Sequence, residues 1–166
     1  MKNETFSTHV ITPEQMLEHW QGHRNLTRRV IEAFPGDSLF THTIGGMRPF
    51  SEMAVELIQV AGPGISAIVS GQWKEFGDMS DFKAETSPKT KDELLALWDR
   101  VTEHINELWP KISEERFQQK EIAFGQYEGE IWSHLCYFID NEIHHRGQAY
   151  VYLRDLGVEP PFFWER

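Results

Sequence analysis

The spacing of apolar residues constrains the fold of this 166-residue chain more than any other feature. In four separate stretches, 13–34, 49–73, 90–108 and 130–156, apolar residues recur at steps of three and four. This spacing places them on one face of an α-helix. Since no strand pattern of comparable strength appears, the sequence predicts an all-α protein. We expect a four-helix bundle, mostly antiparallel, with up to two long crossover connections.

Several helix ends are marked by local signals. Thr12 can cap the first helix, with Gln15 completing a capping box, and the Pro-Gly-Asp sequence at 35–37 stops it. The third helix is expected to start at Thr90. Gly157 suits the left-handed residue that closes the last one.

Between these signals the helical pattern is interrupted. Gly-Pro-Gly at 62–64 predicts either a kinked second helix or a short separate helix on the same axis. We expect a loop at 39–47 and a mobile, polar connection at 74–91, where any lid would lie. The aromatic tail at 158–166 is expected to pack back across the bundle.

Composition narrows the classes of function. A chain of this length with 40% hydrophobic and 25% charged residues suits one domain spanning 1–166. Its formal charge, 16 − 26 = −10, disfavours nucleic acid and anionic lipid as partners. No apolar run approaches 18 residues, so no membrane span is expected. A single cysteine, Cys136, excludes an intrachain disulfide and favours a cytoplasmic location.

The richest polar cluster lies at 140–148, within the last helix. Asn141 and His145 share a face because residues four apart stack on a helix. That face is apolar further along, so His145 points inward and needs a polar side chain, a water or a metal as its partner. The spacing Asn141-Glu142-x-x-His145 matches a zinc-protease motif whose first histidine is missing, which disfavours protease chemistry.

A further ligand would have to come from another helix. The best candidate is Glu56, a carboxylate within the apolar second helix. A buried Glu56 would be protonated, hydrogen-bonded to Asn141 and His145, or metal-bound, since an unpaired buried charge is costly. The weaker candidates are histidines: His19, His23, His42, His104 and His134.

The sequence His-His-Arg-Gly-Gln at 144–148, followed by Leu-Arg-Asp-Leu-Gly at 153–157 and a Pro-Pro tail, resembles the closing motif of the DinB-like superfamily. The resemblance covers most of the chain. It implies a four-helix bundle, often dimeric, with a three-histidine site for a divalent metal. The three ligand positions fall on Glu56, Asn141 and His145, so two of the three depart from histidine.

The resemblance implies one of two kinds of function. One is a metal-dependent enzyme, a thiol-dependent transferase or related hydrolase, that uses zinc or nickel and a low-molecular-weight thiol or another small molecule. The other is a non-catalytic bundle with a degenerate site that binds a small molecule or acts as a stress-induced dimer. A homodimer is expected in either case. The sequence assigns no catalytic residue and no substrate.

For four other residues of the last helix, we expect structural roles. His144 and Arg146 are expected to coat the outer or dimer-facing side of the last helix. His134 is expected to be a hydrogen-bonded core histidine, and Cys136 an inert packing residue.

Overall fold

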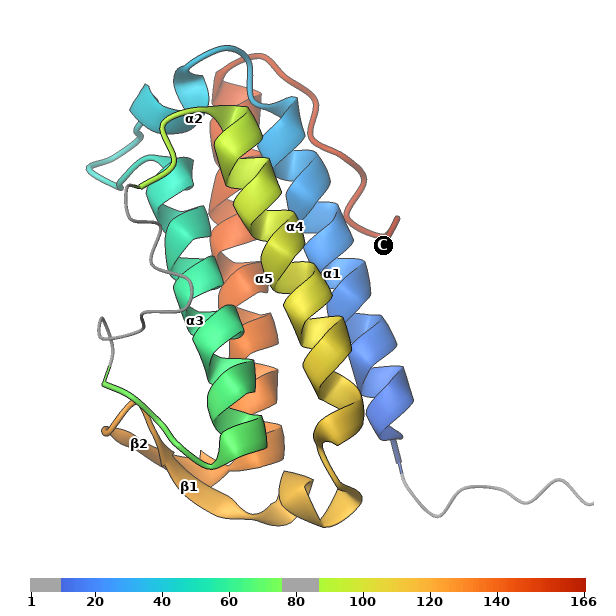
Figure 1. Ribbon diagram of the computed structural model, residues 1–166. Coiled ribbons are helices and arrows are strands. Elements are labelled where there is room, and N and C mark those ends of the chain that lie inside the picture. Colours follow the sequence, from blue (N-terminus) through green and yellow to red (C-terminus); the bar gives the residue numbers. More distant parts are fainter. Residues whose placement is uncertain (1–9, 76–86) are drawn as a thin grey trace, which may run out of the picture.

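A computed structural model describes residues 10–75 and 87–166. Four long helices lie side by side along one axis (Figure 1): α1 (Pro13–Ala33), α3 (Phe50–Ser70), α4 (Lys91–Leu108) and α5 (Ile131–Asp155). Both α1 and α3 pack against α4 and α5. In Figure 1, α1 and α5 run upward while α3 and α4 run downward, so α1 and α5 are parallel neighbours, as are α3 and α4. The expected mostly antiparallel arrangement therefore holds for only two of the four neighbouring pairs.

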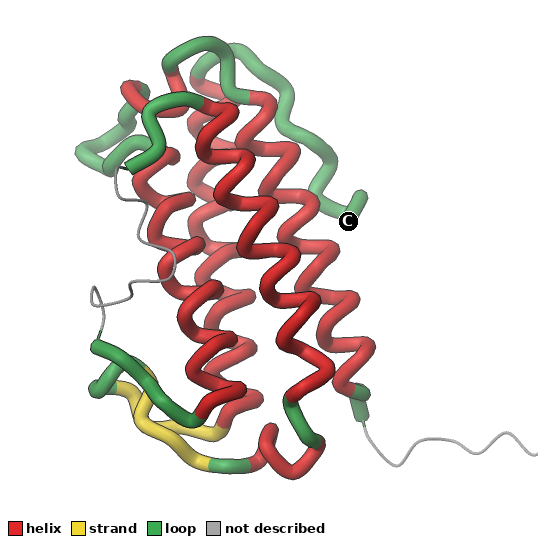
Figure 2. The backbone as a smooth tube through the Cα atoms, viewed as in Figure 1, coloured by secondary structure: helices red, strands yellow, loops and turns green. Residues whose placement is uncertain are grey.

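A β-hairpin closes one end of the bundle (Figure 2), so the fold is mostly helical and contains two short strands that were not predicted. Strand β1 (Lys120–Ala123) pairs antiparallel with β2 (Tyr127–Glu130). Phe124 and Gly125 between them both have positive φ, as in the turns that suit two-stranded hairpins. The strands were not predicted because each has only four residues and their outward positions are mostly polar.

Short helical turns connect the long elements. The predicted loop at 39–47 overlaps a one-turn helix, α2 (Ser38–Thr41), so that expectation was wrong in part. After α4 the chain forms two 3-10 turns, Trp109–Lys111 and Glu114–Gln118. The connection predicted at 74–91 lies mostly outside the described residues, because 76–86 are not described.

The predicted helix ends are confirmed. The Thr12 hydroxyl accepts from the Gln15 backbone N–H at 3.3 Å, while the Gln15 side chain accepts from the Thr12 N–H at 2.9 Å. Thr90 caps α4 through the N–H of Glu93. Gly157 follows α5 with φ of 73°. Local hydrogen bonding therefore determines where these helices begin and end.

Helix α3 continues through its Gly-Pro-Gly sequence, so a short separate helix is excluded. Pro63 lies inside the helix and removes one backbone donor. Gly64 allows the helix to lie close to the ring of Phe138 on α5, since a Cβ at this position would be 2.6 Å from two ring carbons. Packing on the adjacent helix thus holds together a segment that local preference would interrupt.

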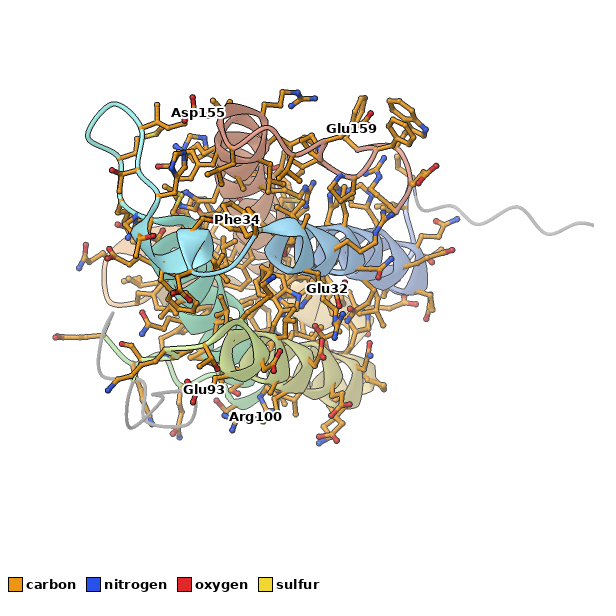
Figure 3. The ribbon with its side chains drawn as sticks, turned by 90° about the horizontal axis from the view of Figure 1, so that it is seen from above. Glu32, Phe34, Glu93, Arg100, Asp155 and Glu159 are labelled. Carbon is orange, nitrogen blue, oxygen red and sulfur yellow. The ribbon has the colours of Figure 1, made fainter. Side chains whose placement is uncertain are left out.

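The core lies between the four long helices. Trp20 and Trp98 are fully buried, and Phe34 lies between the helices while Glu93 and Arg100 lie at the outer edge (Figure 3). Helix α3 is long and apolar enough by length and composition to cross a membrane, although the sequence analysis expected no such segment. Most of it, 67% of the most apolar window, is instead buried inside the bundle, as is usual for a core helix.

The C-terminal tail returns from the end of α5 alongside α1, as predicted (Figure 1). Val158 donates to the carbonyl of Leu153 at 2.8 Å, and Arg29 on α1 bonds the carbonyl of Glu165. The tail rings are not part of the core, however, because Phe163 and Trp164 are more than half exposed.

Candidate functional site

Glu56 and His145 meet inside the bundle, although 89 positions separate them in the sequence. Glu56 Oε1 on α3 lies 3.2 Å from His145 Nε2 on α5. His145 is buried, and a quarter of the Glu56 side chain is exposed. The predicted convergence of these two residues is therefore observed.

Gln148 orients the His145 ring. His145 Nδ1 lies 2.9 Å from Gln148 Oε1, and the Gln148 amide nitrogen lies 3.3 Å from His144 Nε2. Both ring nitrogens of His145 consequently face an oxygen acceptor. A neutral imidazole carries only one N–H, so either Nε2 donates to Glu56 while a rotated Gln148 amide donates to Nδ1, or Nδ1 donates to Gln148 and Nε2 presents its lone pair.

Asn141 lies one helical turn before His145 on α5. Its amide nitrogen is buried and, within the described part of the chain, has no hydrogen-bond partner. Asn141 is thus not joined to Glu56 or His145 by a hydrogen bond. Because an amide can be rotated to exchange its oxygen and nitrogen, the same position can present an oxygen ligand.

Arg48 is the counter-ion of Glu56 and was not predicted to take part in the site. Its guanidinium bonds Glu56 Oε2, and its backbone carbonyl accepts from the Tyr152 hydroxyl at 2.9 Å. Gly45 and Gly46, both with positive φ, shape the loop that brings it there. Burial raises the pKa of the Glu56 carboxyl, but Arg48 and His145 outweigh burial and hold that pKa below its ordinary value.

Few side chains at this site could act as metal ligands. Among residues 10–75 and 87–166, no three side chains of His, Cys, Asp or Glu converge as a metal site. The ligands that the site offers are one imidazole nitrogen, one carboxylate and one amide. Such a set can hold a divalent ion only if solvent or substrate completes the coordination.

A second polar cluster, which the sequence did not predict, surrounds Glu142. The Thr27 hydroxyl donates to Glu142 Oε1 at 2.6 Å. Arg24 on α1 and Arg146 on α5 lie 3.9 Å and 3.7 Å from its carboxylate. Burial raises the pKa of Glu142, and the two arginines and Thr27 oppose that effect. Arg146 is only 5% exposed, so its predicted outer position is wrong.

His23 lies between two arginines. Arg146 Nη2 is 2.8 Å from its Nδ1, and Arg166 Nη1 is 2.9 Å from its Nε2. Burial, together with these cations and His19, lowers the pKa of His23 to about 3. His23 is therefore neutral near pH 7, and it links the tail to the cluster around Glu142.

The remaining candidates have partners elsewhere. His134 Nε2 lies 3.2 Å from the Glu121 carbonyl, consistent with a hydrogen-bonded core residue. His42 lies 3.0 Å from Asp155, and His104 bonds Ser66 at 2.7 Å. Burial raises the pKa of the Cys136 thiol, which makes it a poor nucleophile.

The DinB family model matches residues 1–165. The chain belongs to the DinB family. The uncharacterized protein YjoA of Bacillus subtilis (strain 168) is 26% identical over 157 residues, which span 92% of this chain and 96% of YjoA.

Solved structures of DinB-like proteins share this fold. The crystal structure of YjoA from Bacillus subtilis superposes with a TM-score of 0.70 at 22% identity, covering 92% of this chain and 99% of that one. A DinB-like protein from Bacillus cereus ATCC 10987 gives a TM-score of 0.67 at 17% identity, covering 91% and 97%. These likenesses establish the DinB-like fold, and the chemistry must be argued from the site.

Proposed function

We propose that this DinB-family protein binds one divalent metal ion, zinc or nickel, through Glu56, His145 and Asn141. The observation that carries the proposal is the 3.2 Å separation of Glu56 Oε1 and His145 Nε2. Two ligands about 2.0–2.1 Å from one tetrahedral ion lie about 3.3 Å apart. The two side chains are thus already spaced as ligands of a shared ion would be.

The hydrogen bond from Gln148 supports this proposal. A histidine whose Nδ1–H donates to an outer oxygen presents the lone pair of Nε2 to a metal, the common arrangement around metal ligands. In the absence of metal, a ring proton on Nε2 can be donated to Glu56 instead. A metal ion would take the place of that proton between Nε2 and the carboxylate.

A metal held by so few protein ligands would keep open positions, at which it lowers the pKa of a bound water or thiol. We propose a thiol-dependent transfer, or a related hydrolysis, as the reaction class. Arg48 would be freed from Glu56 when the carboxylate binds metal, and its guanidinium would then be available to an anionic group of a small-molecule substrate.

Arg48 also favours a second candidate function. Because its guanidinium already neutralises Glu56, the site is electrostatically satisfied without a metal. In this alternative the protein is a non-catalytic bundle that binds a small molecule at a degenerate site. The two candidates differ in whether a divalent ion displaces Arg48.

Isothermal titration of the protein with Ni²⁺ distinguishes them. We expect one ion per chain. His145→Ala should weaken binding at least about tenfold because it removes the nitrogen ligand. Arg48→Ala should strengthen it, since a competing cation is removed.

His19→Ala, which removes an exposed histidine of α1, is the matched control and should bind Ni²⁺ like the wild type. No binding by the wild type, together with none by Arg48→Ala, would reject the metal proposal. Binding that is equal in the wild type and His145→Ala would reject this site.

A further inference from the structure

The outer face of α5 is left open by the other long helices. Seen along the bundle in Figure 3, α5 lies at the edge of the molecule, with no described helix outside it. Ile143 and Val151 on this face are 40% and 53% exposed. Between them lies Gly147, where an added Cβ would meet nothing within 4 Å. This stretch of α5 therefore offers an apolar surface that another helix can approach.

The C-terminal tail adds aromatic side chains to one side of this face. Phe163 and Trp164 in the tail are 66% and 61% exposed. Together with Ile143 and Gly147 they line a groove of about 460 Å³ between α5 and the tail. The groove thus enlarges the apolar surface beyond a single helix face, and a continuous patch of this kind on a protein surface marks an association site.

Charged residues border the apolar stretch in a symmetric order. Asp140 and Arg154 are both exposed, and each lies seven residues, about two helical turns, from Gly147. In the described chain neither of them forms an ion pair. Glu159 lines the tail side of the groove, so this face carries no excess of positive charge. Its distinctive feature is the order of charges along α5, acidic before Gly147 and basic after it.

A second α5 that runs antiparallel and is centred on Gly147 matches this order. Residues at equal distances before and after Gly147 then come level, because the two-fold axis reverses the helix direction. Asp140 of each copy lies level with Arg154 of the other, and Ile143 lies level with Val151. A parallel copy in register would instead bring Asp140 level with Asp140, which like-charge repulsion disfavours.

We propose that α5 and the tail form the interface of a symmetric homodimer, in which the two α5 helices pack antiparallel about Gly147. The partner that fits the groove is a second copy of this chain, whose apolar side chains would cover Ile143, Val151 and Trp164. The two-fold axis repeats every contact, so the Asp140–Arg154 pair occurs twice. None of these residues is a proposed metal ligand, so the association can be measured in metal-free protein.

Sedimentation equilibrium of the full chain, in buffer that contains a chelator, tests the interface by charge reversal. Asp140→Arg and Arg154→Asp each bring like charges level across the two-fold axis, so each should raise the dimer Kd at least about tenfold. The double variant restores opposite charges and should return the Kd to within about threefold of the wild type. Glu103→Arg reverses an exposed charge on α4, which lies across the bundle from α5, and as the matched control should dimerise like the wild type.

Gly147→Glu tests the centre of the interface, since it brings two carboxylates together at the two-fold axis. The variant should fold, because the position has free space, and should raise the dimer Kd at least about tenfold. Circular dichroism checks its fold, and the charge reversals decide the question if it fails to fold. Wild-type protein that stays monomeric at about 100 µM, single reversals that leave the Kd unchanged, or a double variant as weak as the single reversals would overturn the proposal.

Discussion

Glu142 is a buried carboxylate at the interface of α1 and α5. Its carboxylate is buried with Arg24 and Arg146 on either side, so removing it leaves two buried cations without a counter-ion. Glu142→Ala should lower the free energy of unfolding by about 3–5 kcal/mol, the usual effect of breaking a buried ion pair. Urea unfolding measures the loss. Glu18→Ala, at an exposed position of α1, should change the stability by less than about 0.5 kcal/mol, and an equal loss in both variants would contradict this role.

The low pKa of His23 predicts how the free energy of unfolding depends on pH. Its pKa falls to about 3 in the folded protein, against about 6.5 when the chain is unfolded. Between these values the unfolded state binds the proton and the folded state does not. The stability contributed by neutral His23 is therefore complete above about pH 6.5 and decreases as the pH falls toward 3.

Urea unfolding at pH 7 and pH 5 tests this dependence. The wild type should lose more stability than His23→Gln over that interval, because glutamine does not titrate. Parallel losses in the two proteins would show that His23 is not the group responsible.

At the residue scale, the sequence identified two residues of the candidate site but not all the residues that contact them. Helical spacing placed His145 inward, and Glu56 was the best further candidate because it is a carboxylate on an otherwise apolar helix, so both were predicted. Arg48 was missed because its approach to Glu56 depends on the backbone of a glycine-containing loop. Arg146 was placed outside because its partners on α1, Thr27 and His23, become neighbours only when α1 packs on α5.

At the scale of elements, close packing of α3 on α5 depends on Gly64. A Cβ there would lie 2.6 Å from two ring carbons of Phe138, closer than real Cβ contacts. Gly64→Ala should therefore destabilise the protein by about 1–3 kcal/mol. Gly147→Ala on α5 meets no neighbour and should stabilise by about 0.5–1 kcal/mol, since alanine favours helix. Thermal unfolding of the two variants checks the opposite signs, and the same sign in both would contradict the packing described.

Helices were predicted better than the hairpin for a physical reason. A helix of 18–25 residues repeats its apolar face several times and carries its own caps, so its signal is local and redundant. The hairpin has four residues a strand and packs against α5, so its stability comes from contacts that sequence spacing does not record. The continuity of α3 through Pro63 was left open for the same reason.

At the scale of the whole molecule, we predict a homodimer. The outer face of α5 exposes Ile143 and Val151, and such apolar surface is commonly covered by association. Light scattering at tens of micromolar protein should give about twice the chain mass of 19.4 kDa. A monomer mass under those conditions would contradict the prediction of a homodimer.

The direction in which each helix runs is also a property of the whole molecule. Helical periodicity specified which faces are buried, but parallel and antiparallel neighbours bury the same faces. The connection between α3 and α4 is long enough for a crossover along the bundle, which explains why α3 and α4 can run in the same direction. The four long helices were predictable, whereas this path was not.

Metal analysis of the protein decides whether Glu56 and His145 hold a divalent metal ion. The protein is stripped with chelator, incubated with excess zinc or nickel, dialysed against metal-free buffer and analysed for both elements. We expect about one ion per wild-type chain, and far less in Glu56→Gln and His145→Ala, because each variant removes a strong ligand. Wild-type protein that retains neither metal, or variants that retain as much as the wild type, would contradict the claim.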